Sequence, residues 1–361
     1  MKISKESLKG YLLEEALAYL IRNTGYQLIV DKQQDPIELR NRGNGLVVVG
    51  RGGEHQADVL GQLLWIPTFT YPIRLFIEAK FKNSKVGIDI VRNAIGIVDD
   101  LNQNYSPMTD SNRILVKRYS YNFAIFSTAG FSKNAVDMAI AHKISLIDLS
   151  GEEFSILRSS IDQTAREITE GFYFNDEVAA GIQGNRDNYF SRGSFIKTLR
   201  KYLRIRLGTW PSEVHSRELS VQEDSIFSNL LRHLINTIES YGELLVGMAN
   251  GPFLLILKEN SPGIFRDYAS RYPTHRINIS WGHENRNKKQ WTITPYEDSY
   301  AYELTFTLPK LLGDLVFKNN NPTQTALDVK GQFLSSITIY THSNRKDELF
   351  RLEYSNGRRN G

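Results

Sequence analysis

The run from Pro72 to Phe81 constrains the fold most, because it is apolar apart from Arg74, Glu78 and Lys80. Its opening proline, its length and its β-branched and aromatic residues predict a buried strand. Side chains alternate between the two faces of a strand, so Glu78 and Lys80 are expected on the same face. Charges in such a strand are costly to bury unless they pair with each other or bind a counter-ion. We therefore expect a sheet that carries a charged site.

A second carboxylate precedes this strand. Asp58 follows the glycine-rich turn 50–53 and lies near the start of an alternating segment, 56–63, that predicts a neighbouring strand. Two carboxylates and a lysine suit Mg²⁺, which takes one or two carboxylates and otherwise binds water and phosphate oxygens. Lys80 would then orient or deprotonate the attacking water, or stabilise charge on the phosphate. The alternative is that all three side chains are ordinary solvated charges of a sheet.

The order of these segments resembles the Mrr-like restriction endonuclease branch of the PD-(D/E)xK nuclease superfamily. The similarity runs from Glu14 to Ile147, and Ala57 stands where the superfamily's name has a proline that is often absent from the family. The resemblance implies a restriction-endonuclease-like mixed central sheet flanked by helices. It also implies Mg²⁺-dependent hydrolysis of phosphodiester bonds, usually in DNA, with Mn²⁺ as a substitute. The matching segments are 12–26, 52–58, 77–80, 86–92, 126–135 and 144–148.

Under this resemblance Asp58 and Glu78 are the metal ligands, and Lys80 completes the catalytic set. Members of the family often add a glutamate from the first helix, which we expect over residues 5–23. At about 100° per residue, Glu14 lies at the edge of the apolar face, whereas Glu15 points nearly opposite. Glu14 is therefore the expected further catalytic residue, as a metal or water ligand, against the alternative of an ordinary charge at the helix flank.

Composition limits the other classes of protein. The chain has 361 residues and 41% hydrophobic content, enough for more than one core, so two domains are expected. The absence of cysteine excludes disulfides and thiolate zinc sites. The first residues show no secretory leader, and no run of about 18 apolar residues occurs, which predicts a soluble cytoplasmic protein without a membrane partner.

Helices and strands are expected to alternate through the first half of the chain, which predicts a mixed α/β sheet with parallel pairing at its far side. We expect a nuclease domain over 1–170, a linker over 171–190 and a second domain over 191–361. Besides the site strands, the expected strands are 26–30, 46–49, 121–127 and 145–147; the helices are 86–101, 132–142 and 152–169, and 102–113 is expected to be a polar loop.

The second domain has the pattern of an α+β domain with an antiparallel sheet that exposes one face to water. Its expected role is to recognise a target, a partner or a signal. The expected elements are a helix over 222–241, a hairpin over 243–248 and 253–258, and strands over 276–281, 291–294 and 300–308.

The basic segment 192–206 predicts an amphipathic helix. Lys and Arg exceed Asp and Glu by 4 in the whole chain, and the whole of this excess lies after residue 170. The basic side of the helix is a candidate for contacts with a phosphate backbone, and the alternative is a solvated face of a docked helix. Candidate nucleic-acid contacts are Lys197, Arg200, Lys201 and Arg204 in this helix, with His55, Gln56, Lys82 and Arg92 near the predicted site.

Two functions stay open at this point. The first is a Mg²⁺-dependent endonuclease that cuts DNA, in restriction or another form of anti-phage defence. The second is a nucleic-acid-binding regulatory module that keeps the nuclease fold and is controlled by a partner or ligand through its C-terminal domain. The presence of Asp58, Glu78 and Lys80 together favours the enzyme, and a homodimer stays open under both hypotheses.

Overall fold

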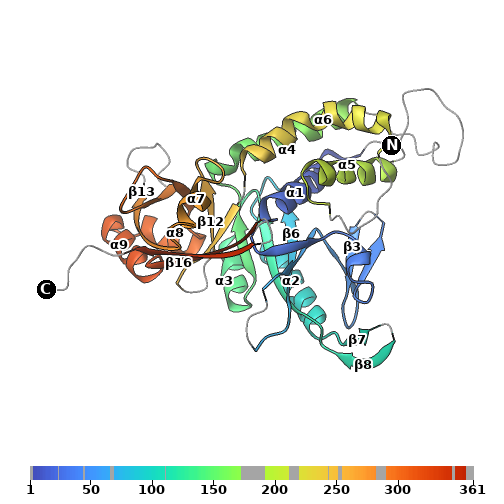
Figure 1. Ribbon diagram of the computed structural model, residues 1–361, viewed down its shortest axis with the longest axis horizontal. Helices are drawn as coiled ribbons and strands as arrows, with labels where there is room; N and C mark the ends of the chain where they lie inside the picture. Colours follow the sequence, from blue (N-terminus) through green and yellow to red (C-terminus); the bar gives the residue numbers. More distant parts are fainter. Residues whose placement is uncertain are drawn as a thin grey trace, which may run out of the picture.

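The computed structural model combines a mixed sheet in the N-terminal half with a β-barrel in the C-terminal half (Figure 1). No helix among the described residues is both long and apolar enough to cross a membrane. Most of the expected linker, 172–190, lies outside the described residues. The structure describes residues 3–22, 24–43, 45–65, 69–109, 111–171, 192–210, 219–242, 244–250, 254–281, 290–343 and 346–354.

The central sheet has five strands among the described residues and is mixed, as expected. Strands β1, β5 and β6 pair antiparallel, whereas β6, β9 and β10 pair parallel. Its order is β1 (Tyr26–Ile29), β5 (Val59–Leu63), β6 (Ile73–Lys80), β9 (Ser120–Ser127) and β10 (Ser145–Asp148).

Helices cover both faces of this sheet, because its strands are apolar on both faces. Phe76 packs into a core with α2 (Ile88–Asn102) and α3 (Lys133–Ala141). The next residue, Ile77, packs into a second core with α1 (Lys5–Ile21) and α4 (Ser155–Gly171). The sheet is thus the middle layer of three.

The strand expected over 56–63 is divided at Asp58. Its first part, β4 (Glu54–Ala57), pairs with β3 (Gly45–Val49), which pairs with β2 (Leu39–Arg42), in a separate three-stranded sheet. Its second part is β5 of the central sheet. Asp58 therefore occupies the single residue at which the chain passes from one sheet to the other.

Part of the predicted polar loop 102–113 is instead a β-hairpin of β7 (Ser106–Thr109) and β8 (Asn112–Val116). Sequence reading missed it, and β2 as well, because neither shows a regular inward apolar alternation. On the hairpin both Met108 and Leu115 are exposed.

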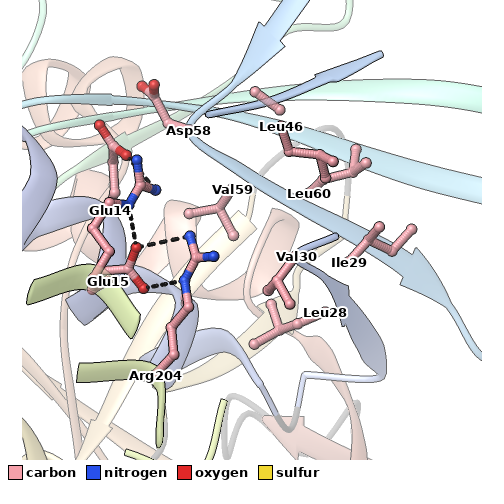
Figure 2. A pocket seen from close by; sticks show the side chains of 13 residues that line it. Glu14, Glu15, Leu28, Ile29, Val30, Leu46, Asp58, Val59, Leu60 and Arg204 are labelled. Atoms are coloured by element: carbon pink, nitrogen blue, oxygen red, sulfur yellow. Dashed lines mark hydrogen bonds and ion pairs between the residues drawn. The ribbon is translucent and has the colours of Figure 1, made fainter. Parts of the chain in front are cut away.

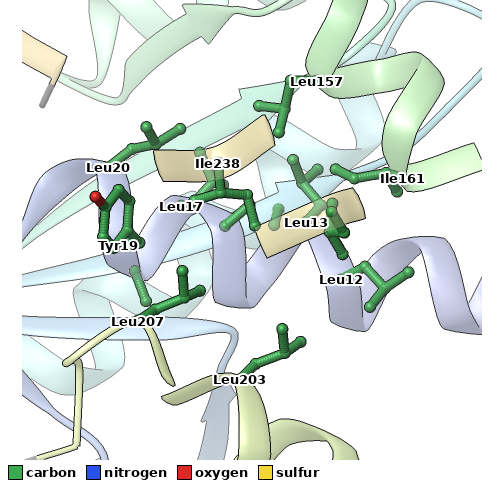
Figure 3. Close-up of a cluster of buried hydrophobic side chains, with 14 of the residues drawn as sticks. Leu12, Leu13, Leu17, Tyr19, Leu20, Leu157, Ile161, Leu203, Leu207 and Ile238 are labelled. Carbon is green, nitrogen blue, oxygen red and sulfur yellow. The ribbon is translucent and has the colours of Figure 1, made fainter. Parts of the chain in front are cut away.

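Two helices that follow residue 190 pack on the N-terminal half. Helix α5 (Arg192–Arg206) and helix α6 (Val221–Ser240) bury their apolar sides in the core that also contains α1 and α4. Figure 3 shows part of this core, in which side chains of α1 pack against side chains from later in the chain. The α1 residues are Leu12, Leu13 and Leu17, and the later ones are Leu157, Ile161, Leu203, Leu207 and Ile238.

This shared core predicts how the chain responds to a cut between residues 171 and 192. Both pieces should stay together, because separation would expose the apolar sides of α1, α5 and α6 to water. We expect a single particle of full size on gel filtration, although a denaturing gel shows two fragments. Two separately eluting folded fragments would contradict the shared core.

The second core lies inside a closed barrel of seven strands, as far as the described residues show. The expected antiparallel sheet with one wet face is wrong in two respects. Strand β16 pairs with β11 and closes the sheet, and β13 pairs with β17 in parallel. Around the barrel the order is β11 (Leu244–Met248), β12 (Leu254–Glu259), β15 (Leu304–Thr307), β14 (Gln290–Pro295), β13 (Thr274–Trp281), β17 (Lys346–Tyr354) and β16 (Ser336–Ser343).

In the described part of this half, three short helices accompany the barrel: α7 (Ile264–Ala269), α8 (Lys310–Phe317) and α9 (Pro322–Gln332). Phe265, Leu312 and Val329, one from each, are buried in the barrel core.

The barrel contacts the turn that follows α1. The ring of Tyr340, on β16, packs against Gly25, whose φ of +85° lies in the left-handed region. A Cβ at position 25 would overlap this ring, so the turn requires glycine for its conformation and for its contact.

Candidate active site

Asp58 is fixed to the central sheet by its side chain. Its Oδ2 accepts a hydrogen bond of 2.8 Å from the backbone N–H of Ala79. Because Ala79 lies between Glu78 and Lys80 on β6, this bond holds the Asp58 carboxylate beside the other two predicted residues. The structure therefore brings the three together, while their catalytic roles stay predictions.

Glu78 and Lys80 share one face of β6, as the alternation predicts. Lys80 Nζ forms an ion pair with Glu78 Oε1. The two side chains keep 17% and 23% of their surface exposed, so a ligand from solvent has access to both.

Glu14 approaches Asp58 from α1. The glutamate is buried, and its Oε2 lies 2.8 Å from Arg200 Nη2 but accepts no hydrogen bond among the described residues. Burial raises the pKa of Glu14 to about 8, and the neighbouring carboxylates of Asp58 and Glu15 add to the rise. Arg200 opposes this shift without cancelling it.

Asp58 lies close enough to Glu78 and Glu14 for their charges to interact. Burial raises its pKa to about 6, and the charge of Glu78 adds to the rise, while the Ala79 N–H and Lys80 oppose it. Figure 2 shows Asp58 and Glu14 at one end of a small cavity whose other walls include apolar Val59 and Leu60. The cavity has a volume of about 20 Å³, room for about one water molecule.

The raised pKa of Asp58 predicts a pH-dependent stability. A carboxyl whose pKa is higher in the folded state than in the unfolded state favours folding at low pH. That contribution is lost as the pH rises from about 4 through about 6. Asp58→Asn should therefore have a higher free energy of unfolding than wild type at pH 7.5 in EDTA, by on the order of 3 kcal/mol at most, and so a higher unfolding temperature.

The advantage of Asp58→Asn should be smaller at pH 4.5, where the wild-type carboxyl is largely protonated in the folded protein. Thermal unfolding of both proteins at the two pH values checks this. An equal difference at both would show that Asp58 keeps an ordinary pKa.

The described residues fit a divalent cation held mainly by solvent and substrate oxygens. They contain no group of three or more His, Asp or Glu side chains arranged to enclose a metal ion. Mg²⁺ needs only one or two carboxylates, and Asp58 and Glu78 carry negative charges close enough to repel each other. A cation between them would relieve that repulsion.

Two of the four candidate basic side chains of α5, Arg200 and Arg204, face α1 and not solvent. Arg200 is buried and donates through Nε to Glu15 Oε1 at 2.7 Å, and half-buried Arg204 donates through Nε to Glu15 Oε2 at 2.8 Å. The expected exposure of Arg200 and Arg204 is therefore wrong, and so is the expectation that Glu15 points away from the core. The reason is that α1 is covered on all sides from Leu12 to Ile21. Lys197 is exposed and Lys201 half-buried, and their contacts with phosphate stay predictions.

Of the other predicted contacts, His55 and Arg92 have local partners. His55 Nε2 lies 2.7 Å from Asp100 Oδ2, and Asp100 Oδ1 accepts from the N–H of Gly52, so His55 supports the glycine-rich turn. Lys82 and Gln56 are exposed, and so is Arg92, which pairs with Asp89. Their nucleic-acid contacts stay predictions.

Sequence reasoning missed Arg200 as a neighbour of the site. It lies 186 positions after Glu14, and nothing in the spacing of either segment indicates that they meet.

Comparisons with known proteins give distant similarity. No family model and no curated protein match the chain. One solved structure, a protein of unknown function called AF1548, matches 56% of this chain and 100% of its own, with 14% identity and a TM-score of 0.25. Another, the MspJI restriction endonuclease in complex with a 27-mer oligonucleotide, matches 52% of this chain and 35% of its own, with 14% identity and a TM-score of 0.25. This level of similarity does not assign a family.

Proposed function

We propose that the chain is a Mg²⁺-dependent endonuclease that hydrolyses phosphodiester bonds of DNA, with Mn²⁺ as a substitute. The observation that supports it is the hydrogen bond from Ala79 N–H to Asp58, which gathers Asp58, Glu78 and Lys80 at one place on the central sheet. The partial exposure of Glu78 and Lys80 leaves room for a phosphate to approach.

Each residue has a separate role in this proposal. Asp58 and Glu78 would hold a Mg²⁺ ion, which would supply Lewis-acid stabilisation of the charge on the scissile phosphate. Lys80 donates hydrogen bonds from Nζ to a phosphate oxygen or to the attacking water, and so favours the charged transition state. Glu14 orients water in the small cavity beside Asp58.

The biological setting we propose is restriction or another form of anti-phage defence. The barrel would then recognise a target, a partner or a signal, and a homodimer would allow both DNA strands to be cut. The separate role of the barrel is supported by its own hydrophobic core, which is distinct from the core beside the candidate site.

A second function has one observation in its favour. Lys80 already neutralises Glu78, and Arg200 lies against Glu14, so the protein supplies cations of its own to two of the carboxylates. Such a site also suits a regulatory module that binds nucleic acid without cutting it, under the control of a partner or ligand at the barrel.

Incubation of the full chain with supercoiled plasmid, linear single-stranded DNA and RNA distinguishes the two functions. With Mg²⁺ or Mn²⁺ we expect nicked and linear plasmid, and with EDTA we expect no cleavage. Binding of DNA without cleavage under any of these metal conditions would favour the regulatory module. Cleavage of RNA alone would change the proposed substrate from DNA to RNA.

A further inference from the structure

Arg200 holds together two carboxylates that helical geometry would separate. Consecutive residues of an α-helix point about 100° apart, so Glu14 and Glu15 diverge from α1. Arg200 nevertheless contacts both, through Nη2 to Glu14 Oε2 at 2.8 Å and through Nε to Glu15 Oε1 at 2.7 Å. The guanidinium thus holds Glu15 by a hydrogen bond and Glu14 by an ion pair, and its planar group reaches both carboxylates at once.

All three side chains are buried, so these contacts are not surface pairs that solvent would screen. The exposed fractions of the side chains are 6% for Arg200, 8% for Glu14 and 1% for Glu15. Arg200 also lines the small cavity together with Glu14 and Asp58. The guanidinium therefore lies within the candidate site.

We propose that Arg200 is a positioning residue of this site, which keeps Glu14 beside Asp58 by binding Glu14 and Glu15 at once. The inference rests on the proposed function, because it concerns the same metal site. It extends the site to α5, so the segment before residue 171 does not contain all of it.

Arg204 provides a matched comparison on the same helix. Its guanidinium contacts Glu15 through Nε and Nη2, at 2.8 and 2.9 Å. Among the described residues, its hydrogen bonds and ion pairs reach Glu15 and not Glu14. Substitution of Arg204 therefore disturbs the buried charges at Glu15 while the contact between Arg200 and Glu14 remains.

The test is a double-mutant cycle on Mn²⁺ affinity, measured by calorimetry on the full chain without DNA. Glu14→Gln should weaken Mn²⁺ binding at least about tenfold in the wild-type background, the lower range for groups that orient metal ligands. In the Arg200→Lys background the same change should weaken binding less than about threefold, since a lysine keeps the charge but cannot fix two carboxylates. Any direct effect of Arg200 on Mn²⁺ affinity is the same with Glu14 or with Gln at position 14, so it cancels in the cycle.

In the Arg204→Lys background, the Glu14→Gln effect should keep its wild-type size. Thermal unfolding and circular dichroism establish that each variant is folded. If Arg200→Lys does not fold, the pair Arg200→Gln and Glu15→Gln, which removes one charge of each sign, replaces it as the background.

The outcomes separate the two proposals. If Glu14→Gln lowers Mn²⁺ affinity equally in the wild-type and Arg200→Lys backgrounds, the positioning role is overturned. The proposed nuclease function is not affected by that result. Absence of both Mn²⁺ binding and metal-dependent cleavage in the wild type would overturn the two together.

Discussion

Replacement of Asp58 or Glu78 with alanine is expected to lower metal-dependent DNA cleavage by at least about a thousandfold, the upper range for loss of one stabilising group in an active site. The reason is that the proposed metal site has two protein carboxylates, and either variant leaves one. Initial rates of plasmid nicking in Mg²⁺ measure the effect.

Asp58→Asn separates chemistry from structure, because its amide oxygen can still accept the hydrogen bond from Ala79 N–H. We expect this variant to stay folded and to be as inactive as Asp58→Ala. Asp224→Asn, an exposed carboxylate that pairs with Arg206 on the outer helices, is the control and should cleave at the wild-type rate. Full activity in either Asp58 variant, or in Glu78→Ala, would remove these residues from the site.

The next largest effect is expected for Lys80→Arg, with a decrease in cleavage of at least about a hundredfold. Arginine retains the charge and the ion pair with Glu78, but its broad planar head group cannot replace a compact ammonium next to water or phosphate. Single-turnover cleavage at saturating DNA isolates the chemical step.

Lys80→Arg should bind DNA with nearly unchanged affinity in Ca²⁺, so that the loss appears in the rate and not in binding. Near-normal turnover in this variant would mean that Lys80 only balances the charge of Glu78.

The sequence predicts the centre of the candidate site well because its geometry is local. Alternation on one strand puts Glu78 and Lys80 on the same face, and the expected neighbouring strand brings Asp58 close. The surroundings were not predictable in the same way. Glu15 and Arg200 lie far apart in the chain, and their meeting depends on how α5 packs over α1.

The same distinction applies to the fold. Helix α5 was predicted at its observed limits, since its apolar spacing is a property of the segment itself. The side of α5 that is covered was not predicted, because Arg200 is recognised as buried only when its carboxylate partners are known. Closure of the barrel likewise depends on pairing between β11 and β16, which lie far apart in the chain.

The contact between Gly25 and Tyr340 limits how such a chain can evolve. The tyrosine belongs to the barrel, and the glycine belongs to the turn at the end of the helix that carries Glu14. A different barrel joined to this sheet by recombination would have to present an equally fitting surface at that turn. The two halves are therefore expected to be inherited and to diversify as a pair, with glycine kept at position 25 and position 340 limited to side chains that fit against it.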